Sequence, residues 1–320
     1  MKIMRIIQVT PSGQKSKSGN RTTANRWARI FRNLGHNVVT ITNYDGRPAD
    51  MMVAIHAWRS AEAIERFKIL YPDQPLVVCL SGTDINQFIH THPRLTLRSM
   101  ELADAMVCLH NLVKDITPSS LQQKLQVIFQ SAKPLPGPRR LSSRNFNICV
   151  ASHLREVKDP MRTALAARGL PKQSRIRVTH LGMAHNQKAA EKAIAEMRRN
   201  PRYKWKGEVP GWRVRQEFKR AHLMVISSKA EGGANVISEA VVAGVPIIAS
   251  NIEGNIGLLG KSYGGYYPMG DTNALRDLML KAEGSGEFVE RLTAQCRTLE
   301  SKFTIEHEQE TWRKLIAKLI

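Results

Sequence analysis

The sequence predicts an α/β protein built from two domains, each with a doubly wound parallel sheet. The chain has 320 residues, which is long for a single hydrophobic core. Short apolar runs of strand length alternate along it with stretches in which apolar residues recur at helical spacing. This alternation is typical of parallel sheets joined by crossover helices. A proline-rich break at Lys133–Arg140 interrupts the pattern once, and the alternation then starts again.

In the first half, six apolar runs predict short buried strands: Ile3–Val9, Val38–Thr42, Met51–Ile55, Leu76–Leu80, Ala105–Leu109 and Leu125–Phe129. Apolar residues recur at helical spacing from Ala24 to Leu34 and from Ala61 to Leu70, between these strands. We therefore assign residues 1–133 to one Rossmann-like domain.

Three prolines and a glycine in the break cannot continue a helix or a strand, so residues 134–144 are predicted to be a linker. A second series of strands follows: Asn145–Val150, Arg175–Leu181, Tyr203–Lys206, His222–Ser227 and Pro246–Ala249. The tail from about Asp271 to Ile320 has a helical pattern. Residues 145–300 are therefore expected to form a second Rossmann-like domain.

The composition argues against membrane insertion and against a metal or disulfide framework. No apolar run reaches the length of a membrane span, and we interpret Met1–Thr10 as a first strand rather than a signal peptide. A cytoplasmic protein is expected. The four cysteines lie far apart in the sequence, so neither a zinc site nor a disulfide is indicated. We expect no metal ion and no cofactor.

The net charge of +21 raises the possibility of nucleic-acid binding. The basic residues are scattered, however, with local density at Arg139–Arg140, Arg198–Arg199 and Arg213–Arg220, and no nucleic-acid-binding motif accompanies them. Steering of small anionic substrates explains part of the charge. Small-molecule partners are therefore favoured over nucleic acid, and no membrane partner is expected.

A strand–loop–helix segment in the second half carries the clearest functional signal. After the buried run His222–Ser227 the chain reads Glu231-Gly232-Gly233, and a helix is predicted from Asn235, which we interpret as its N-cap. The start of that helix favours an anion, and Glu239, one turn further on, can reach back to the same place. A pyrophosphate at the helix start and a carboxylate on ribose hydroxyls is what a nucleotide-sugar site needs.

The loop after the first strand separates this protein from a Rossmann dehydrogenase. A dinucleotide site requires Gly-x-Gly-x-x-Gly there, whereas Thr10–Asn20 is long and has glycines only at Gly13 and Gly19. This loop fits an acceptor site instead, to which we assign Ser12, Gly13, Ser18, Gly19 and Asn20. Lys15 and Lys17 are expected to close over an anion.

Two further loops of the first domain follow predicted strands. His56 ends one strand and lies near Arg59, which could contact an anionic acceptor. Gly82, Thr83 and Asp84 follow another strand, where ligands bind to open α/β sheets. His56 is equally compatible with a catalytic and a structural role, and the segment at Asp84 could simply be a capped helix start.

The segment Glu231–Glu239, closed by Ala243–Pro246, resembles the donor motif of glycosyltransferases with two Rossmann-like domains, the GT-B class of family 4 type. The resemblance implies two domains that face each other across a cleft, with the acceptor in residues 1–133 and the UDP-sugar in residues 145–300. It also implies a C-terminal helix, residues 301–320, that crosses back to the first domain.

In that family the loop corresponding to Ser152–Pro160 supplies an arginine and a lysine to the donor diphosphate. Lys158 matches the lysine, His153 replaces the arginine, and Arg155 is a candidate substitute. The chain has no Asp-x-Asp pair, which a magnesium-dependent enzyme would use, so cationic side chains must stabilise the leaving diphosphate. The glycine-rich Asn251–Gly260 is predicted to be a loop near the donor sugar.

A narrower resemblance rests on seven phrases in order: residues 20–28, 55–60, 80–84, 128–132, 153–160, 231–236 and 253–260. Together they resemble the selenosugar synthases of selenoneine biosynthesis. The resemblance implies a metal-independent enzyme that joins selenophosphate to the anomeric carbon of a UDP-sugar, typically UDP-N-acetylglucosamine. The alternative is a general glycosyltransferase with a hydroxyl acceptor on a glycan or lipid, for which the basic face of Thr22–Leu34 offers a membrane contact.

The candidate residues fall into three groups. Those expected to take part in catalysis are Lys158, Arg155, Glu231 and His56. Those expected to bind the donor are His153, Gly232, Gly233, Ala234, Asn235, Val236, Glu239, Lys206 and Gly207. Those expected to bind the acceptor are Ser12, Gly13, Ser18, Gly19, Asn20, Arg59, Gly82, Thr83 and Asp84.

Overall fold

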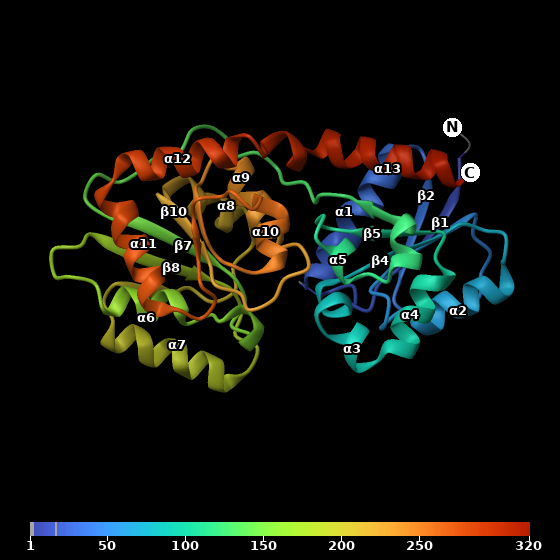
Figure 1. Cartoon of the computed structure of the whole chain (residues 1–320), viewed down its shortest axis with the longest axis horizontal. Coiled ribbons are helices and arrows are strands. Elements are labelled where there is room, and N and C mark those ends of the chain that lie inside the picture. Colours follow the sequence, from blue (N-terminus) through green and yellow to red (C-terminus); the bar gives the residue numbers. More distant parts are fainter. Residues whose placement is uncertain (1–2, 17) are drawn as a thin grey trace. The chain divides into compact units, whose positions relative to one another are not determined.

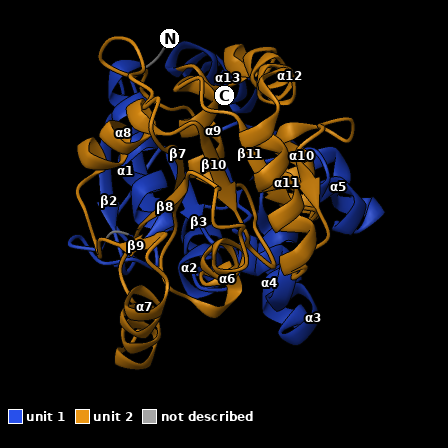
Figure 2. Ribbon diagram, turned by 90° about the vertical axis from the view of Figure 1, so that its left-hand side faces the viewer, with its two compact units in different colours: residues 1–130, 305–320 blue, residues 131–304 orange. Residues whose placement is uncertain are grey.

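A computed structural model describes residues 3–16 and 18–320 and divides the chain into two compact units (Figures 1 and 2). The first unit contains residues 1–130 together with 305–320, and the second contains residues 131–304. Each unit is built around a six-stranded parallel sheet with helices packed against it. The predicted α/β fold class is confirmed.

The sheet of the first unit has the strand order β2-β1-β3-β4-β5-β6. Its strands are β1 Arg5–Val9, β2 Asn37–Ile41, β3 Met51–Ile55, β4 Leu76–Cys79, β5 Ala105–Cys108 and β6 Leu125–Val127. The four residues of β4 and all five of β3 are buried. Strands buried on both faces read as continuous apolar runs, which is why they were visible in the sequence.

Helices cover both faces of this sheet (Figure 1). They are α1 Gly19–Asn33, α2 Ala61–Leu70, α3 Ile89–Thr91, α4 Pro93–Leu102, α5 Val113–Ile116 and α13 Ile305–Leu319. A π-helical turn, Asp84–Phe88, precedes α3, and a 3₁₀ turn, Ser119–Lys124, precedes β6.

The C-terminal helix α13 packs on α1 within the first unit. The Trp312 ring makes edge contacts with Trp27 and Phe31, at centroid distances of 4.8 and 4.7 Å. The Trp27 indole N–H also donates a hydrogen bond to the buried Glu308 carboxylate at 2.7 Å, which Arg26 compensates. Aromatic packing and a compensated buried charge together fix this helix on the first unit.

The second sheet has the order β12-β11-β10-β7-β8-β9. Its strands are β7 Phe146–Ala151, β8 Ile176–Leu181, β9 Tyr203–Trp205, β10 Leu223–Ile226, β11 Ile247–Ser250 and β12 Tyr266–Tyr267. The two-residue β12 had no signal in the sequence, because it is shorter than any pattern that periodicity can detect.

The helices of the second unit are α6 Arg162–Arg168, α7 Gln187–Arg199, α8 Gly211–Arg220, α9 Asn235–Val242, α10 Glu253–Leu259, α11 Thr272–Gly284 and α12 Gly286–Arg297. Two 3₁₀ turns, Glu156–Lys158 and Glu300–Phe303, complete it. The prediction that the glycine-rich segment Asn251–Gly260 is a loop is therefore wrong, because α10 covers most of this segment. Among the described residues, none of the helices has both the length and the apolarity that crossing a membrane requires.

His180 lies in the middle of this fold and has no exposed surface. Its Nε2–H donates to the Ser152 carbonyl oxygen at 3.0 Å, and its Nδ1 accepts a hydrogen bond from the Tyr203 hydroxyl at 2.9 Å. Burial lowers the pKa of this ring to about 4.

We expect His180 to make folding pH-dependent. In the unfolded chain a histidine has a pKa of about 6.5, so below that pH the unfolded state takes up a proton that the folded state does not. The stability is present at pH 7 and is lost as the pH falls, by about 2 kcal/mol between pH 7 and pH 5. Urea denaturation of the wild type and of His180→Gln measures it. An equally steep pH dependence in the variant would contradict the assignment.

Candidate functional site

Both sheets have a point at which the order of the strands reverses. In the second unit the chain builds β7, β8 and β9 in one direction and then places β10 on the other side of β7. In the first unit the reversal falls between β1 and β3. The loops that leave neighbouring strands at such a point separate and form the usual ligand crevice of an open α/β sheet.

The loops after β7 and β10 bring Lys158 and Glu231 together. The Lys158 ammonium forms an ion pair with the Glu231 carboxylate at 2.5 Å, although 73 residues separate them in the sequence. The Ser228 hydroxyl donates to the same carboxylate oxygen at 2.6 Å. The Glu231 side chain is only 8% exposed and that of Lys158 is 26% exposed. A cation is thus held in place at the edge of the switch point.

Hydrogen bonds to backbone carbonyl groups connect these two loops to each other. The Ser227 hydroxyl donates to the carbonyl oxygens of Lys158, at 3.2 Å, and Asp159, at 2.9 Å. The Lys229 N–H donates to the Val157 carbonyl at 2.8 Å. Asp159 adopts a left-handed conformation with φ of 43° and ends the 3₁₀ turn that carries Lys158. The position of the lysine is therefore set by the backbone of both loops.

His153 and Arg155 lie on the same loop but differ in surroundings. The Nδ1 atom of His153 accepts a hydrogen bond from the Met183 N–H at 3.1 Å. A ring that accepts at Nδ1 carries its proton on Nε2 and is neutral, so in this arrangement His153 offers a hydrogen-bond donor and not a charge. Arg155 is exposed on the same loop.

The glycine pair and helix α9 follow Glu231. Gly233 has a φ of 139°, a conformation that favours glycine, and it leads into α9. The N-cap of α9 is Ala234 and not Asn235, which is the first helical residue. The predicted cap was therefore wrong by one position. Because Ala234 has no side-chain cap to offer, the start of this helix keeps its preference for an anion. Val236 and Glu239 lie in the first turns of α9.

Helix α10 contributes residues to this region that the sequence had suggested only as a loop. Gly254 packs so closely that an added Cβ would lie 2.4 Å from the Glu231 carbonyl oxygen. The buried Asn255 amide donates to the Ser250 carbonyl at 2.9 Å, and the Ser250 hydroxyl donates to the Ser228 carbonyl at 2.6 Å. The segments at the carboxyl ends of β10 and β11 are thereby joined by a hydrogen bond.

Lys206 and Gly207 follow the end of β9. The Lys206 ammonium pairs with the Glu217 carboxylate of α8 at 2.5 Å. Gly207 has a φ of 67°, and its carbonyl accepts from the Gly182 N–H at 2.8 Å. Burial raises the pKa of the Cys149 thiol on β7, and the charges of Glu217, Lys206 and Glu239 act on it as well. Lys206 and Glu239 therefore lie within electrostatic reach of the same central strand.

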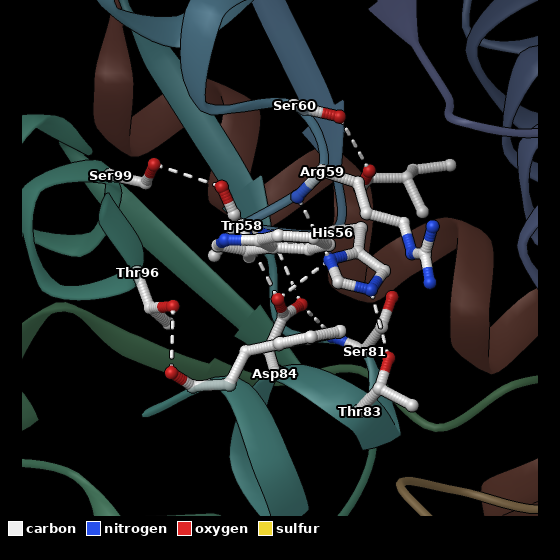
Figure 3. A network of polar contacts seen from close by, with 12 residues as sticks. His56, Trp58, Arg59, Ser60, Ser81, Thr83, Asp84, Thr96 and Ser99 are labelled. Atoms are coloured by element: carbon white, nitrogen blue, oxygen red, sulfur yellow. Dashed lines mark hydrogen bonds and ion pairs between the residues drawn. The ribbon is translucent and has the colours of Figure 1, made fainter. Parts of the chain in front are cut away.

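In the first unit a buried carboxylate organises the loops after β3 and β4 (Figure 3). Asp84 accepts hydrogen bonds from three backbone N–H groups, those of Ala57, Trp58 and Ser81, at 2.8–3.0 Å. Its Oδ1 also lies 2.7 Å from Nδ1 of His56. Both side chains are 1% exposed. Asp84 is thus the anchor that holds two strand-end loops together.

His56 carries strain at this point. Its φ of 80° is uncommon for a residue with a side chain and costs about 1–3 kcal/mol. The Nε2 atom lies 2.8 Å from the Thr83 hydroxyl oxygen, so both ring nitrogens have partners within the network. With Nδ1–H donated to Asp84, Nε2 accepts from the Thr83 hydroxyl. The hydrogen bond to the buried His56 therefore orients the exposed Thr83.

Arg59 extends outward beside this network. Its guanidinium lies over the rings of Trp58 and Phe88, at 5.4 and 5.7 Å from their centroids. These two rings are themselves stacked, with centroids 4.1 Å apart. Stacking on two rings limits the rotamers of Arg59 while leaving its N–H groups available. Gly82, at the end of β4, is half-buried next to Thr83.

The remaining residues assigned to the acceptor lie on the loop before α1. Asn20 accepts a hydrogen bond from the Ser81 hydroxyl at 3.2 Å, which connects α1 to the Asp84 network. The hydroxyls of Ser12 and Ser18 lie 2.7 Å apart, and Ser18 is the N-cap of α1, directly before Gly19. Gly13 lines a separate groove. Lys15 is exposed, and Lys17 lies outside the described residues.

Comparison with known proteins identifies the class. Residues 138–298, half of the chain, match the family of glycosyl transferases group 1. The chain therefore belongs to that family. A comparison with curated proteins gave no match. Across residues 3–16 and 18–320, no three His, Cys, Asp or Glu side chains form a group that could hold a metal ion.

Solved structures with similar folds cover nearly the whole chain. Anabaena HepE aligns with a TM-score of 0.79 at 15% identity, covering 98% of this chain and 100% of that one. The sucrose-phosphate synthase of Thermosynechococcus elongatus aligns with a TM-score of 0.76 at 12% identity, covering 98% of each chain. A glycosyltransferase from Rickettsia africae gives 0.75 at 13% identity, covering 100% and 99%. These likenesses confirm the GT-B class of fold.

We expect Gly254→Ala to destabilise the second unit. The new methyl group would lie 2.4 Å from the backbone oxygen of Glu231 and 2.7 Å from its Cβ, so the loop after β10 must move. Overpacking of this kind costs about 1–3 kcal/mol. Gly284→Ala is the matched control, because nothing lies within 4 Å of its added Cβ. Chemical denaturation of both variants measures the difference, and equal stability would show that α10 can shift without cost.

Proposed function

We propose that this glycosyltransferase uses a UDP-sugar, with UDP-N-acetylglucosamine as the first donor to test. The Lys158–Glu231 pair at the switch point, together with the anion-favouring start of α9, is the observation that carries the proposal. Related folds support it, since Anabaena HepE has been crystallised with UDP and with UDP-glucose.

In this proposal each donor-site residue has a distinct task. The start of α9, from Gly232 to Val236, receives the diphosphate, and Glu239 takes the ribose hydroxyls. Lys158 and the exposed Arg155 stabilise the negative charge that grows on the leaving UDP, without a metal ion. His153 donates one hydrogen bond to the diphosphate through Nε2–H, and Glu231 keeps Lys158 in position. Lys206 and Gly207 border the nucleotide.

We propose further that the acceptor is selenophosphate. Its selenium attacks the anomeric carbon while the bond from that carbon to the UDP oxygen breaks, and UDP leaves with the bonding electrons. Water then cleaves the P–Se bond and releases phosphate, which leaves a 1-selenosugar. Residues 20–28, 55–60 and 80–84, which resemble the selenosugar synthases, contribute Asn20, His56, Thr83 and Asp84 to the first-unit network and support this choice.

The polar rim of that network suits a small anion. The guanidinium of Arg59 can hold the phosphate group, and the Ser12–Asn20 loop can add hydrogen bonds. His56 acts through Thr83, because its own ring is buried. Selenium is a soft nucleophile that needs no strong general base, so a buried histidine is compatible with turnover.

The proposed acceptor predicts that UDP release depends on selenophosphate. Purified protein incubated with UDP-N-acetylglucosamine should release UDP only when selenophosphate is added, and mass spectrometry should detect the selenosugar. Inorganic phosphate should inhibit competitively. Arg59→Ala should raise the KM for selenophosphate about tenfold or more without changing UDP affinity, whereas the exposed Arg98→Ala should behave like the wild type.

Two outcomes separate the finer proposal from the coarser one. If a glycan or lipid hydroxyl supports turnover and selenophosphate does not, the chain is a general glycosyltransferase and the acceptor assignment is wrong. If UDP does not bind at all, the donor proposal fails as well.

Lys158→Ala should lower kcat about 100-fold or more and affect donor binding less, because the charge that the lysine meets is largest in the transition state. The matched control is Lys188→Ala, which removes an exposed lysine at the start of α7. Steady-state kinetics and UDP calorimetry give the two quantities. A higher KM with an unchanged kcat would instead identify Lys158 as a ground-state contact.

A further inference from the structure

A groove of about 880 Å³ lies within the first unit, apart from the Asp84 network. It is bordered by α1, by Gly13 and Gln14 in the loop before α1, and by residues 40–43 at the carboxyl end of β2. Because β2 is the edge strand of its sheet, no further strand fills the space beside it.

One face of α1 gives this groove its charge. Arg21, Asn25, Arg29 and Arg32 follow one another at intervals of three or four residues, so they share a face of the helix. Ala28 lies among them, and its small side chain leaves space in the groove. None of the described residues that line the groove is acidic.

Arg21 is the most unusual of these side chains. It is only 6% exposed, and its Nε and Nη1 atoms have no hydrogen-bond partner among the described residues. The Nε2 of the buried Gln8 also lacks a partner there, and Gln8 Oε1 accepts from the Thr40 hydroxyl at the groove. Buried donors without acceptors cost free energy unless a ligand supplies the acceptors.

This face of α1 is separate from the one that meets the Asp84 network. Asn20 contacts Ser81, and Thr23 accepts from the Gln130 amide at 2.6 Å. At about 100° per residue, the direction of Asn20 and Thr23 lies roughly 150° from that of the groove arginines. The groove therefore opens on the opposite side of the helix from Asn20 and Thr23, and of the residues assigned to the acceptor only Gly13 borders it.

We propose that this groove binds an oligophosphate, a small molecule with two or more linked phosphate groups. Guanidinium groups recognise phosphate through paired hydrogen bonds. The rise from Arg21 to Arg29 is about 12 Å along the helix, so a single phosphate would leave one of the two arginines without a partner. Asn25 and the Thr42 hydroxyl, which also line the groove, add neutral polar groups between the charges.

Calorimetry with inorganic tripolyphosphate tests this site on the full chain, at 150 mM salt and with UDP in excess to occupy the donor site. We expect tripolyphosphate to bind at least tenfold more tightly than orthophosphate. Arg29→Gln, which removes an exposed charge, should weaken tripolyphosphate about tenfold. Arg21→Lys, which keeps the charge but loses the planar donor pair, should do the same.

Arg98→Gln is the control, because it removes one exposed charge from α4 of the same unit. It should leave tripolyphosphate binding unchanged. The proposal is overturned if Arg98→Gln weakens binding as much as Arg29→Gln, which would show a general charge effect. It is also overturned if tripolyphosphate binds no better than orthophosphate, or if a short single-stranded oligonucleotide binds through Arg29 while tripolyphosphate does not. UDP affinity is measured in separate titrations without tripolyphosphate, so a failure of the donor proposal is distinguished from a failure of this one.

Discussion

Backbone groups that leave a parallel sheet at its carboxyl edge lose their ladder partners, and buried side chains must replace them. Asp84 does this for three N–H groups in the first unit. Ser227 does it for two carbonyls in the second unit, and His180 does it for the carbonyl of Ser152. The groups that we assign to the substrates, the exposed Thr83 and the partly buried Lys158, are held in place by this buried network. The proposed site lies on loops, and these hydrogen bonds attach those loops to buried residues next to the sheets.

The sequence predicted the sheets better than the loops because different forces set them. Strands such as Met51–Ile55 are buried on both faces and are recognisable as apolar runs. The partners of the site lie far apart in the chain: Glu231 is 73 residues from Lys158, and Asp84 is 28 residues from His56. No local pattern encodes such pairs. The carboxyl-end rule predicted which loops would carry ligand groups, but it could not predict that Asp84 would be buried as an anchor.

Two local errors have a clear physical origin. A run with three glycines, Glu253–Gly260, favours a loop by propensity. It nevertheless forms α10, and glycine is needed at position 254 because a Cβ there would lie 2.4 Å from the Glu231 carbonyl oxygen. Asn235 is a strong N-cap residue by preference, yet the cap is Ala234, since the turn at Gly233 ends one residue earlier. At Gly254, close packing against Glu231 outweighed local preference.

Among the described residues, the basic side chains fall into two classes, those paired with a carboxylate and those without an acidic neighbour. Arg26, Lys206 and Lys158 pair with carboxylates and contribute no net charge to their surroundings. The arginines on the groove face of α1 have no acidic neighbour among the described residues of the groove lining. Their positive electrostatic potential therefore acts on dissolved anions.

The Lys158–Glu231 pair is both a contact between distant loops and a compensated charge. A lysine already held by a carboxylate loses little conformational entropy when a diphosphate arrives, because its rotamer is fixed in advance. In the proposed donor complex the diphosphate would share the ammonium with Glu231, which would limit what the lysine contributes to ground-state binding. As charge builds up on the leaving oxygen, the balance shifts from the carboxylate toward the phosphate. In the proposed reaction the ion pair would thus direct the cation's effect toward the transition state.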